Sequence, residues 1–148
     1  LASGVRKITL VPLDATHRAL VSLDDCAKLR ALGTPAAEAA AIFTEKRIAS
    51  YDAAQPMERM NAAPVHDALA VAHLVEPGIV TTRKAHVDVE TAGALTVGQT
   101  VVDLRVYGKP PNCEIALDAD EPRFVRFLLE TLGRRGEDAV QSSRRRTG

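Results

Sequence analysis

The pattern of apolar and polar positions divides the chain into strands and helices in a mixed order. Four segments are rich in β-branched or alternating apolar residues and predict strands: 5–14, 85–91, 99–107 and 112–118. Four others combine apolar or alanine-rich runs with helix start or stop signals and predict helices: 22–33, 34–53, 64–75 and 121–132. The resulting order is β-α-α-α-β-β-β-α, with no internal repeat.

Capping residues support these helix boundaries. Ser22 stands three residues before Asp25, which is the spacing of a capping box, and Thr34 and Asp120 are suited to begin the next and the last helix. Gly133 is placed to end the last helix. Between the long helix and the next, residues 52–63 contain Pro56 and are the best candidate for a mobile segment.

This order predicts an α/β fold in which part of a sheet is flanked by helices. The predicted strands are too few to cover the helices, and a doubly wound sheet needs further parallel strands. We expect those strands to lie upstream of Leu1, because the chain begins "LASG" without Met, in the manner of a helix running into a strand.

Length and composition fit one globular domain, which we place at residues 1–133. The chain has 148 residues, of which 46% are hydrophobic and 26% charged. Its 19 basic and 19 acidic residues cancel, so charge gives no reason to expect nucleic acid as a partner. We expect 134–148, including the basic run at 144–146, to be a disordered polar tail.

Cysteine usage and hydropathy bear on the cellular location. Cys26 and Cys113 are isolated, without CxxC spacing, which is typical of a reducing cytoplasm. No apolar stretch approaches the roughly 20 residues that span a bilayer. The sequence shows no basic-then-apolar leader, so we expect a cytoplasmic protein without a membrane partner.

The pair His66–Asp67 is the strongest candidate for chemistry. Both residues stand at the start of the predicted helix 64–75, where the helix dipole favours an anion and lowers the pKa of a histidine. A carboxylate there suits a hard cation, and the histidine can donate a proton to a leaving group. The simpler alternative also stays open: a first-turn acid beside a partly buried histidine.

The remaining histidines are weaker candidates. His17 lies near a predicted strand end, His73 seven residues after His66, and His86 near a strand start. Histidines and cysteines do not show the spacing of a zinc site, so a metalloprotein using His17, His66, His73 and His86 is a minor reading.

Four segments carry a resemblance to a known family. "VPLDATH" (11–17), "PVHDALAVAHLVEP" (64–77), "VDVETAGALTVGQTVVD" (87–103) and "GKPPNCEIALD" (108–118) resemble, in order and spacing, the inosine–uridine-preferring nucleoside hydrolases. The resemblance covers about residues 3–133, and "PVHD" matches the family's C-terminal active-site signature. It implies the C-terminal part of a Rossmann-like mixed sheet flanked by helices, incomplete in this chain.

The resemblance also implies residue roles. Asp67 matches an aspartate that helps to hold a catalytic Ca²⁺, and His66 matches the general acid or orienting group beside the departing base. The implied reaction splits a ribonucleoside into base and ribose. Tyr51 and Gln55, four residues apart before "PVHD", are candidates for contact with the base.

The departures from the family are equally specific. Its DxDxxxDD motif, which supplies the other calcium ligands and the general base, and its ribose-binding residues have no counterpart here. One carboxylate does not make a Ca²⁺ site. We therefore expect the C-terminal half of a nucleoside hydrolase, inactive alone and associated with further copies or with a separate N-terminal half. The alternative is a non-catalytic remnant or interaction module that associates with a partner chain.

Overall fold

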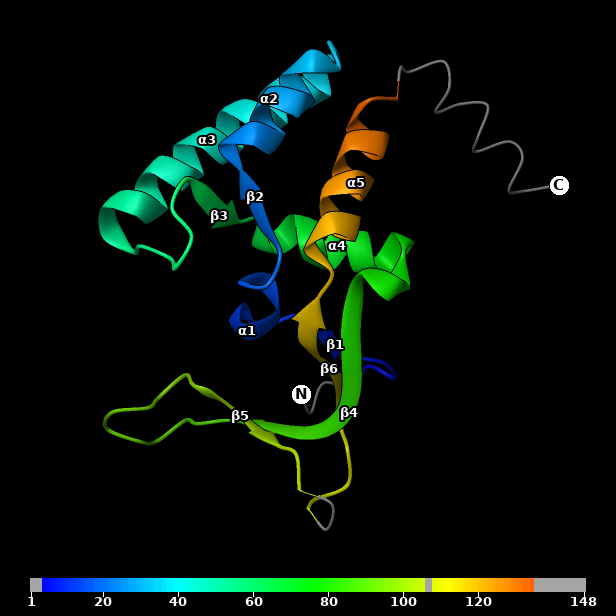
Figure 1. The fold of residues 1–148 in the computed structure, drawn as a ribbon. Helices are drawn as coiled ribbons and strands as arrows, with labels where there is room; N and C mark the ends of the chain where they lie inside the picture. The colour runs from blue at the N-terminus through cyan, green and yellow to red at the C-terminus, as the bar shows by residue number, and fades with distance from the viewer. Residues whose placement is uncertain (1–3, 106–107, 135–148) are drawn as a thin grey trace, which may run out of the picture.

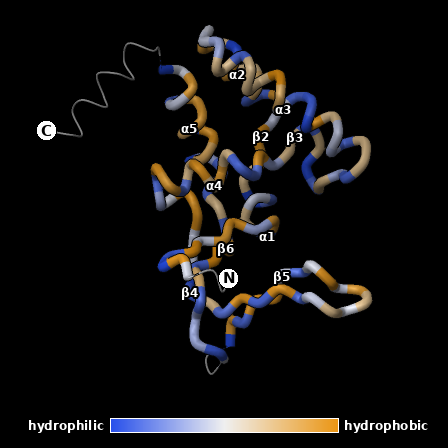
Figure 2. The backbone as a smooth tube through the Cα atoms, turned by 180° about the vertical axis from the view of Figure 1, so that it is seen from behind, coloured by the Kyte–Doolittle hydropathy of each residue, from blue (hydrophilic) through white to orange (hydrophobic). Residues whose placement is uncertain are grey.

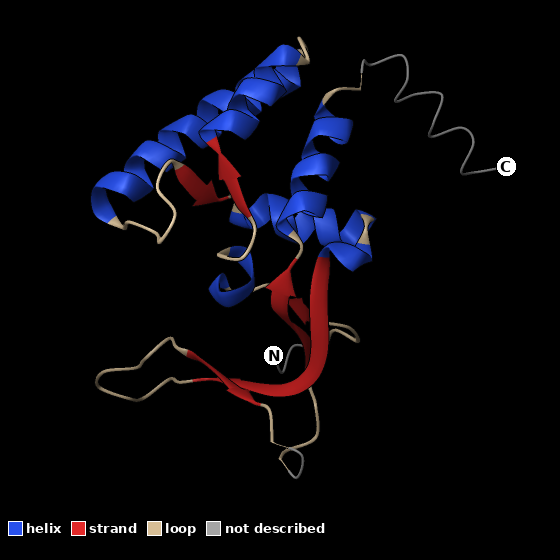
Figure 3. Ribbon diagram, viewed as in Figure 1, coloured by secondary structure: helices blue, strands red, loops and turns tan. Residues whose placement is uncertain are grey.

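The computed structural model describes residues 4–105 and 108–134. The predicted polar tail, 134–148, lies almost entirely outside these residues. The described chain is a mixed α/β structure, as the sequence predicts, with most helices gathered on one side and the main sheet and a long hairpin on the other (Figures 1 and 3).

The main sheet has four strands in the order β1-β6-β4-β5: β1 (Thr9–Leu10), β6 (Cys113–Ala119), β4 (Val80–Val89) and β5 (Thr100–Asp103). β1 runs parallel to β6, whereas β6, β4 and β5 are successively antiparallel. β4 is shared, because its first part pairs with β6 and its second part with β5. Beyond that point β4 and β5 form a hairpin that projects away from the helices (Figure 1).

A side chain completes the hydrogen bonding where β4 passes from β6 to β5. The backbone N–H of Val87 donates to Asn112 Oδ1 at 2.9 Å, and Asn112 Nδ2 donates to the Val87 carbonyl at 2.9 Å. The side-chain amide of Asn112 therefore acts as a further peptide group directly before the start of β6. Its own backbone N–H donates to the Ala85 carbonyl.

Two short strands form a second sheet that the sequence analysis did not predict. β2 (Leu20–Ser22) and β3 (Ala62–Pro64) are antiparallel, with Leu20 opposite Pro64. Pro64 was expected in the first turn of a helix. It instead ends β3, and α4 (His66–Val75) begins two residues later.

The other helices are α1 (Leu13–Thr16), α2 (Leu23–Ala31), α3 (Pro35–Ala54) and α5 (Glu121–Leu132), with a short 3-10 helix at Pro77–Ile79. The predicted caps are confirmed. Ser22 and Asp25 form a capping box, Thr34 accepts from the N–H of Ala37, and Asp120 accepts from that of Arg123. α3 extends through Ala54 and β3 begins at Ala62, so the interruption predicted over 52–63 is confined to 55–61.

The first predicted strand is largely wrong. Within 5–14 only Thr9–Leu10 are paired as a strand, and Leu13 and Asp14 open the single turn of α1. Pro12 lies between the end of this strand and the start of α1, and because it has no backbone N–H, strand pairing cannot continue through it. The consequence is that Thr16 ends a helical turn and His17 follows it, rather than both following a strand end.

Two clusters of buried side chains hold this structure together. The larger joins the helices and β2–β3, with Phe124, Ile48 and Leu69 among its largest fully buried members. The smaller lies on the main sheet around Val87 and Ile115. Hydrophobic segments follow the sheet and continue along the hairpin (Figure 2). Over the described residues, no helix is long and apolar enough to cross a membrane.

Candidate active site

His66 is the first residue of α4, and its position is set by the short strand β3, which ends two residues earlier. β3 is buried along its whole length and pairs with β2. Val65, the residue between β3 and α4, caps the helix without a side-chain hydrogen bond. The start of α4 therefore faces α1 and the C-terminal part of α3, and His66 lies where these elements meet.

Both ring nitrogens of His66 are hydrogen bonded to hydroxyl groups. Nδ1 lies 2.7 Å from Thr16 Oγ1 at the end of α1, and Nε2 lies 3.1 Å from Tyr51 Oη on α3. Arg47, one helical turn before Tyr51, donates from Nη2 to Tyr51 Oη at 3.4 Å. Arg47 also donates from Nε to the carbonyl of Pro64. Residues of α1, α3 and β3 thus fix the orientation of the His66 ring at the start of α4.

His17 completes a cluster of three rings. Its ring centroid lies 5.8 Å from that of His66 and 6.4 Å from that of Tyr51. His17 Nε2 is buried and has no hydrogen-bond partner among the described residues. The sequence analysis ranked His17 below His66. The pair Thr16–His17 in "VPLDATH" is the sequence signal for this cluster, because both residues contact His66.

The environment of His66 favours its neutral form. Burial lowers the pKa of His66, and the positive charges of Arg47 and of a protonated His17 lower it further. The carboxylate of Asp67 acts in the opposite direction. The net effect is a pKa below the usual 6.5, so His66 is neutral at physiological pH.

Asp67 differs from His66 in its surroundings. It is exposed, and its side chain forms no hydrogen bond or ion pair with another described residue. Within 4–105 and 108–134, no three acidic, histidine or cysteine side chains gather into a possible metal site. A Ca²⁺ ion takes six to eight oxygen ligands. Taken by themselves, the described residues therefore do not fit a calcium ion, and Asp67 can supply one carboxylate of such a site.

The two predicted base contacts separate in the structure. Tyr51 is half-buried against His66, whereas Gln55 is exposed at the end of α3. The backbone of Gln55 has left the helical conformation (φ −147°, ψ 62°), which removes the shared face that a spacing of four would give. The Gln55 side chain forms no hydrogen bond to the described cluster.

A groove of about 550 Å³ opens beside the cluster, between His17, Met57, Arg59 and Glu121. Arg59 closes one side of it, because its guanidinium donates to both carboxylate oxygens of Glu121 at 2.7 and 3.1 Å. Glu121 in turn accepts from the backbone N–H of Leu20 at 2.8 Å. Segment 55–61 is thereby tied to β2 and to the start of α5.

The other two histidines lie elsewhere. His73 Nδ1 lies 3.1 Å from the carbonyl of Pro77, and His86 on β4 bonds to the carbonyl of Pro110 and to Asp88. Since neither joins His17 and His66, the described structure gives no support to a four-histidine metal site.

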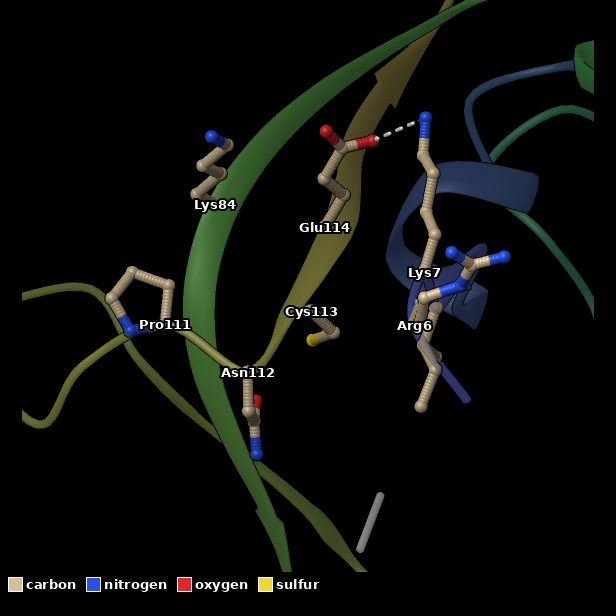
Figure 4. Close-up of a pocket in the computed structure, with 8 residues that line it drawn as sticks. Arg6, Lys7, Lys84, Pro111, Asn112, Cys113 and Glu114 are labelled. Atoms are coloured by element: carbon tan, nitrogen blue, oxygen red, sulfur yellow. Dashed lines mark ion pairs between the residues drawn. The ribbon is translucent and has the colours of Figure 1, made fainter. Parts of the chain in front are cut away.

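A second hollow, of about 390 Å³, lies at the main sheet (Figure 4). Three cations line it, Arg6, Lys7 and Lys84, and Lys7 forms an ion pair with Glu114 at 3.5 Å. None of the residues around His66 borders this hollow, so the two sites are separate.

Comparison with known proteins finds relatives of one kind. The chain is 37% identical over 133 residues to an inosine–uridine preferring nucleoside hydrolase of Leishmania major, covering 88% of this chain and 40% of that protein. It is 34% identical over 126 residues to a pyrimidine-specific ribonucleoside hydrolase, RihA, of Shewanella woodyi, covering 84% of this chain and 40% of the relative.

Solved structures give the same class. A purine-preferring ribonucleoside hydrolase from Gardnerella vaginalis superposes with a TM-score of 0.72 at 29% identity, covering 86% of this chain and 40% of that chain. A plant nucleoside hydrolase, 19% identical, shares the fold with a TM-score of 0.73, over 87% of this chain and 42% of its own.

These proteins define the class as nucleoside hydrolases. The family model described as "Inosine-uridine preferring nucleoside hydrolase" matches residues 1–126, and the chain belongs to this family. The resemblance seen in the sequence is thus confirmed. The chain spans about 40% of the length of the relatives that it matches.

Proposed function

We propose that this chain forms the C-terminal part of the active site of a nucleoside hydrolase that cleaves ribonucleosides to base and ribose. The supporting observation is the placement of His66, whose ring is held by Thr16 and Tyr51 at the start of a helix, directly before the exposed carboxylate of Asp67. In the reaction, the bond between the anomeric carbon and the base nitrogen breaks. Water supplies the hydroxyl group to that carbon and a proton goes to the base.

His66 is the group that we assign to the departing base. As an imidazolium it would donate its proton to the leaving base, and its lowered pKa makes it a stronger acid in that form. Because Tyr51 Oη lies beside His66 Nε2, Tyr51 is suited to contact the base. Gln55 stays a weaker candidate for the same contact.

Calcium dependence is part of the proposal through Asp67. A bound Ca²⁺ supplies positive charge and a template for oxygen ligands in hydrolases of this kind. Asp67 would contribute one of those ligands. Since the described residues do not complete the site, the other ligands must come from the remaining part of the family's fold, in the same polypeptide or in another.

The same reasoning leads us to propose that the 148-residue chain alone is inactive. Its partner would be the N-terminal portion of a nucleoside hydrolase, together with further copies of the assembled unit. We place it in the cytoplasm, which accords with two buried, unpaired thiols at Cys26 and Cys113.

A chimaera tests the proposal. In the chimaera, this chain replaces the part of the Leishmania major relative that it matches. Ribose release from inosine, uridine and cytidine is then measured with Ca²⁺ and with a chelator. We expect activity in the chimaera, a loss of about a hundredfold or more with His66→Ala, and little change with the control His73→Ala. Ribose release at an ordinary rate by the 148-residue chain alone would refute the need for a partner portion.

The alternative function is a non-catalytic interaction module. Three apolar side chains on different elements favour it, because Phe43 on α3, Leu74 on α4 and Leu95 at the hairpin tip are 72%, 79% and 97% exposed. Light scattering after size-exclusion chromatography distinguishes the two. A stable assembly together with an inactive chimaera supports the module, and a monomer at all concentrations counts against it.

A further inference from the structure

In each hydrogen bond to the His66 ring one group donates and the other accepts, and the distances alone do not say which. A neutral imidazole has one N–H donor and one acceptor nitrogen, and its neighbours decide which nitrogen holds the proton. Both neighbours of His66 are hydroxyls, which can donate or accept. Each hydroxyl also bonds to another group that can act in one way only, either as a donor or as an acceptor.

On the Nδ1 side, Thr16 presents an acceptor. Its hydroxyl donates to the carbonyl of Leu13 at 3.3 Å, and a carbonyl can only accept. The single hydroxyl proton is thereby used, so a lone pair of Thr16 Oγ1 faces His66 Nδ1 at 2.7 Å. Thr16 is 2% exposed, which leaves little room for water to compete for these bonds.

On the Nε2 side, Tyr51 presents a donor. The guanidinium of Arg47 can only donate, and it donates to Tyr51 Oη at 3.4 Å. Arg47 is itself anchored through Nε to the carbonyl of Pro64 and lies with Cζ 5.0 Å from the centroid of the Tyr51 ring. The hydroxyl proton of Tyr51 is therefore free to point at His66 Nε2.

From this geometry we infer that Thr16 is a positioning residue, which holds His66 in the tautomer protonated at Nδ1 and leaves Nε2 as the basic nitrogen. Thr16 favours this tautomer, and Tyr51 has a proton free to complete it. The chain of donors runs from Arg47 to Tyr51, from Tyr51 to His66, from His66 to Thr16, and from Thr16 to Leu13.

The significance of Thr16 for catalysis rests on the proposed function. If His66 serves the departing base, Nε2 is the nitrogen that takes up and releases the proton, by way of the Tyr51 hydroxyl that bonds it, since Thr16 keeps Nδ1 occupied. The ring plane is fixed at the same time, because Thr16 and Tyr51 hold it from opposite edges. The tautomer itself is a property of this chain and is measurable without any substrate.

The test is a ¹⁵N NMR measurement of the His66 ring in the 148-residue chain at about pH 8, where a histidine is neutral. We expect a pyrrole-type shift at Nδ1 and a pyridine-type shift at Nε2. Thr16→Val, which has a similar shape and no acceptor, should move the ring toward the other tautomer. Thr16→Ser, which keeps the hydroxyl, should restore the wild-type pattern.

Two results would overturn the inference: a pyridine-type Nδ1 in the wild-type chain, or an unchanged tautomer in folded Thr16→Val. The wild-type spectrum decides the tautomer even if Thr16→Val does not fold. In the active chimaera, Thr16→Val should lower kcat about tenfold or more with little change in KM, and Thr16→Ser should recover most of it. An inactive chimaera whose His66 is protonated at Nδ1 would reject the proposed function and leave the tautomer assignment standing.

Discussion

Tyr51 and His66, fifteen residues apart in the sequence, meet with Tyr51 Oη 3.1 Å from His66 Nε2. The contact joins the last turns of α3 to the first residue of α4. It gives Tyr51 a defined role as a partner of His66, in addition to the contact with the base that the sequence suggested.

Replacing Tyr51 with Phe separates these two roles. The ring stays, but the hydroxyl that holds His66 Nε2 is lost. If Tyr51 acts through His66, kcat of the active chimaera should fall about tenfold while KM stays within about twofold. A rise in KM with an unchanged kcat would instead identify Tyr51 as a binding contact only.

The lowered pKa of His66 predicts how stability depends on pH. The folded state disfavours the charged ring, so the unfolded state binds more protons below its pKa of 6.5. The stabilising contribution is complete above that pH and is lost as the pH falls through the lower pKa of the folded state. Urea unfolding between about pH 5 and 8 should show this loss in wild type and less of it in His66→Gln. A difference between the two proteins that is constant with pH would contradict the prediction.

The thiol of Cys26 should be unreactive in the folded protein. Burial raises the pKa of Cys26 to about 11, and the negative charges of Glu45 and Asp25 act in the same direction. At about pH 8 a disulfide reagent should therefore label Cys26 only after unfolding, and the same chain in concentrated urea is the control. Rapid labelling of Cys26 in the native state, located by peptide mass, would show that the helical core opens readily.

Glu121 should anchor segment 55–61. Glu121→Ala removes the acceptor for both Arg59 and the backbone N–H of Leu20, and we expect a loss of about 1–2 kcal/mol in the free energy of unfolding. Hydrogen exchange should increase within 56–60. Glu130→Ala, which breaks an exposed pair with Arg126 at 3.9 Å, is the matched control and should change stability by less than about 0.5 kcal/mol. Equal effects of the two substitutions would mean that segment 55–61 is held by other contacts.

The sequence predicted the elements whose signals are local. The helix caps at Ser22, Thr34 and Asp120 are short-range patterns, and all three are found in the structure. β2 and β3 could not be predicted in this way, because they have three residues each and owe their pairing to a partner about forty residues away. The strand expected over 5–14 was largely wrong, because Pro12 ends the pairing soon after Leu10 and α1 begins at Leu13.

In the candidate site, too, local signals were predicted and long-range contacts were not. His66 and Asp67 were proposed from the sequence because they are adjacent and carry a family signature. Thr16, fifty residues from His66, was included only as part of the segment "VPLDATH", and Arg47 was not singled out at all. Contacts of this kind depend on how α1, α3 and β3 pack against one another, and residue spacing in a single sequence does not reveal that packing.

The amide of Asn112 has a consequence for how the hairpin is attached to the rest of the molecule. It bonds to both backbone groups of Val87, at the point where β4 passes from β6 to β5. The curved strand β4 is therefore tied at this point to the segment that enters β6, so the hairpin is joined to the main sheet by side-chain hydrogen bonds as well as by its own backbone.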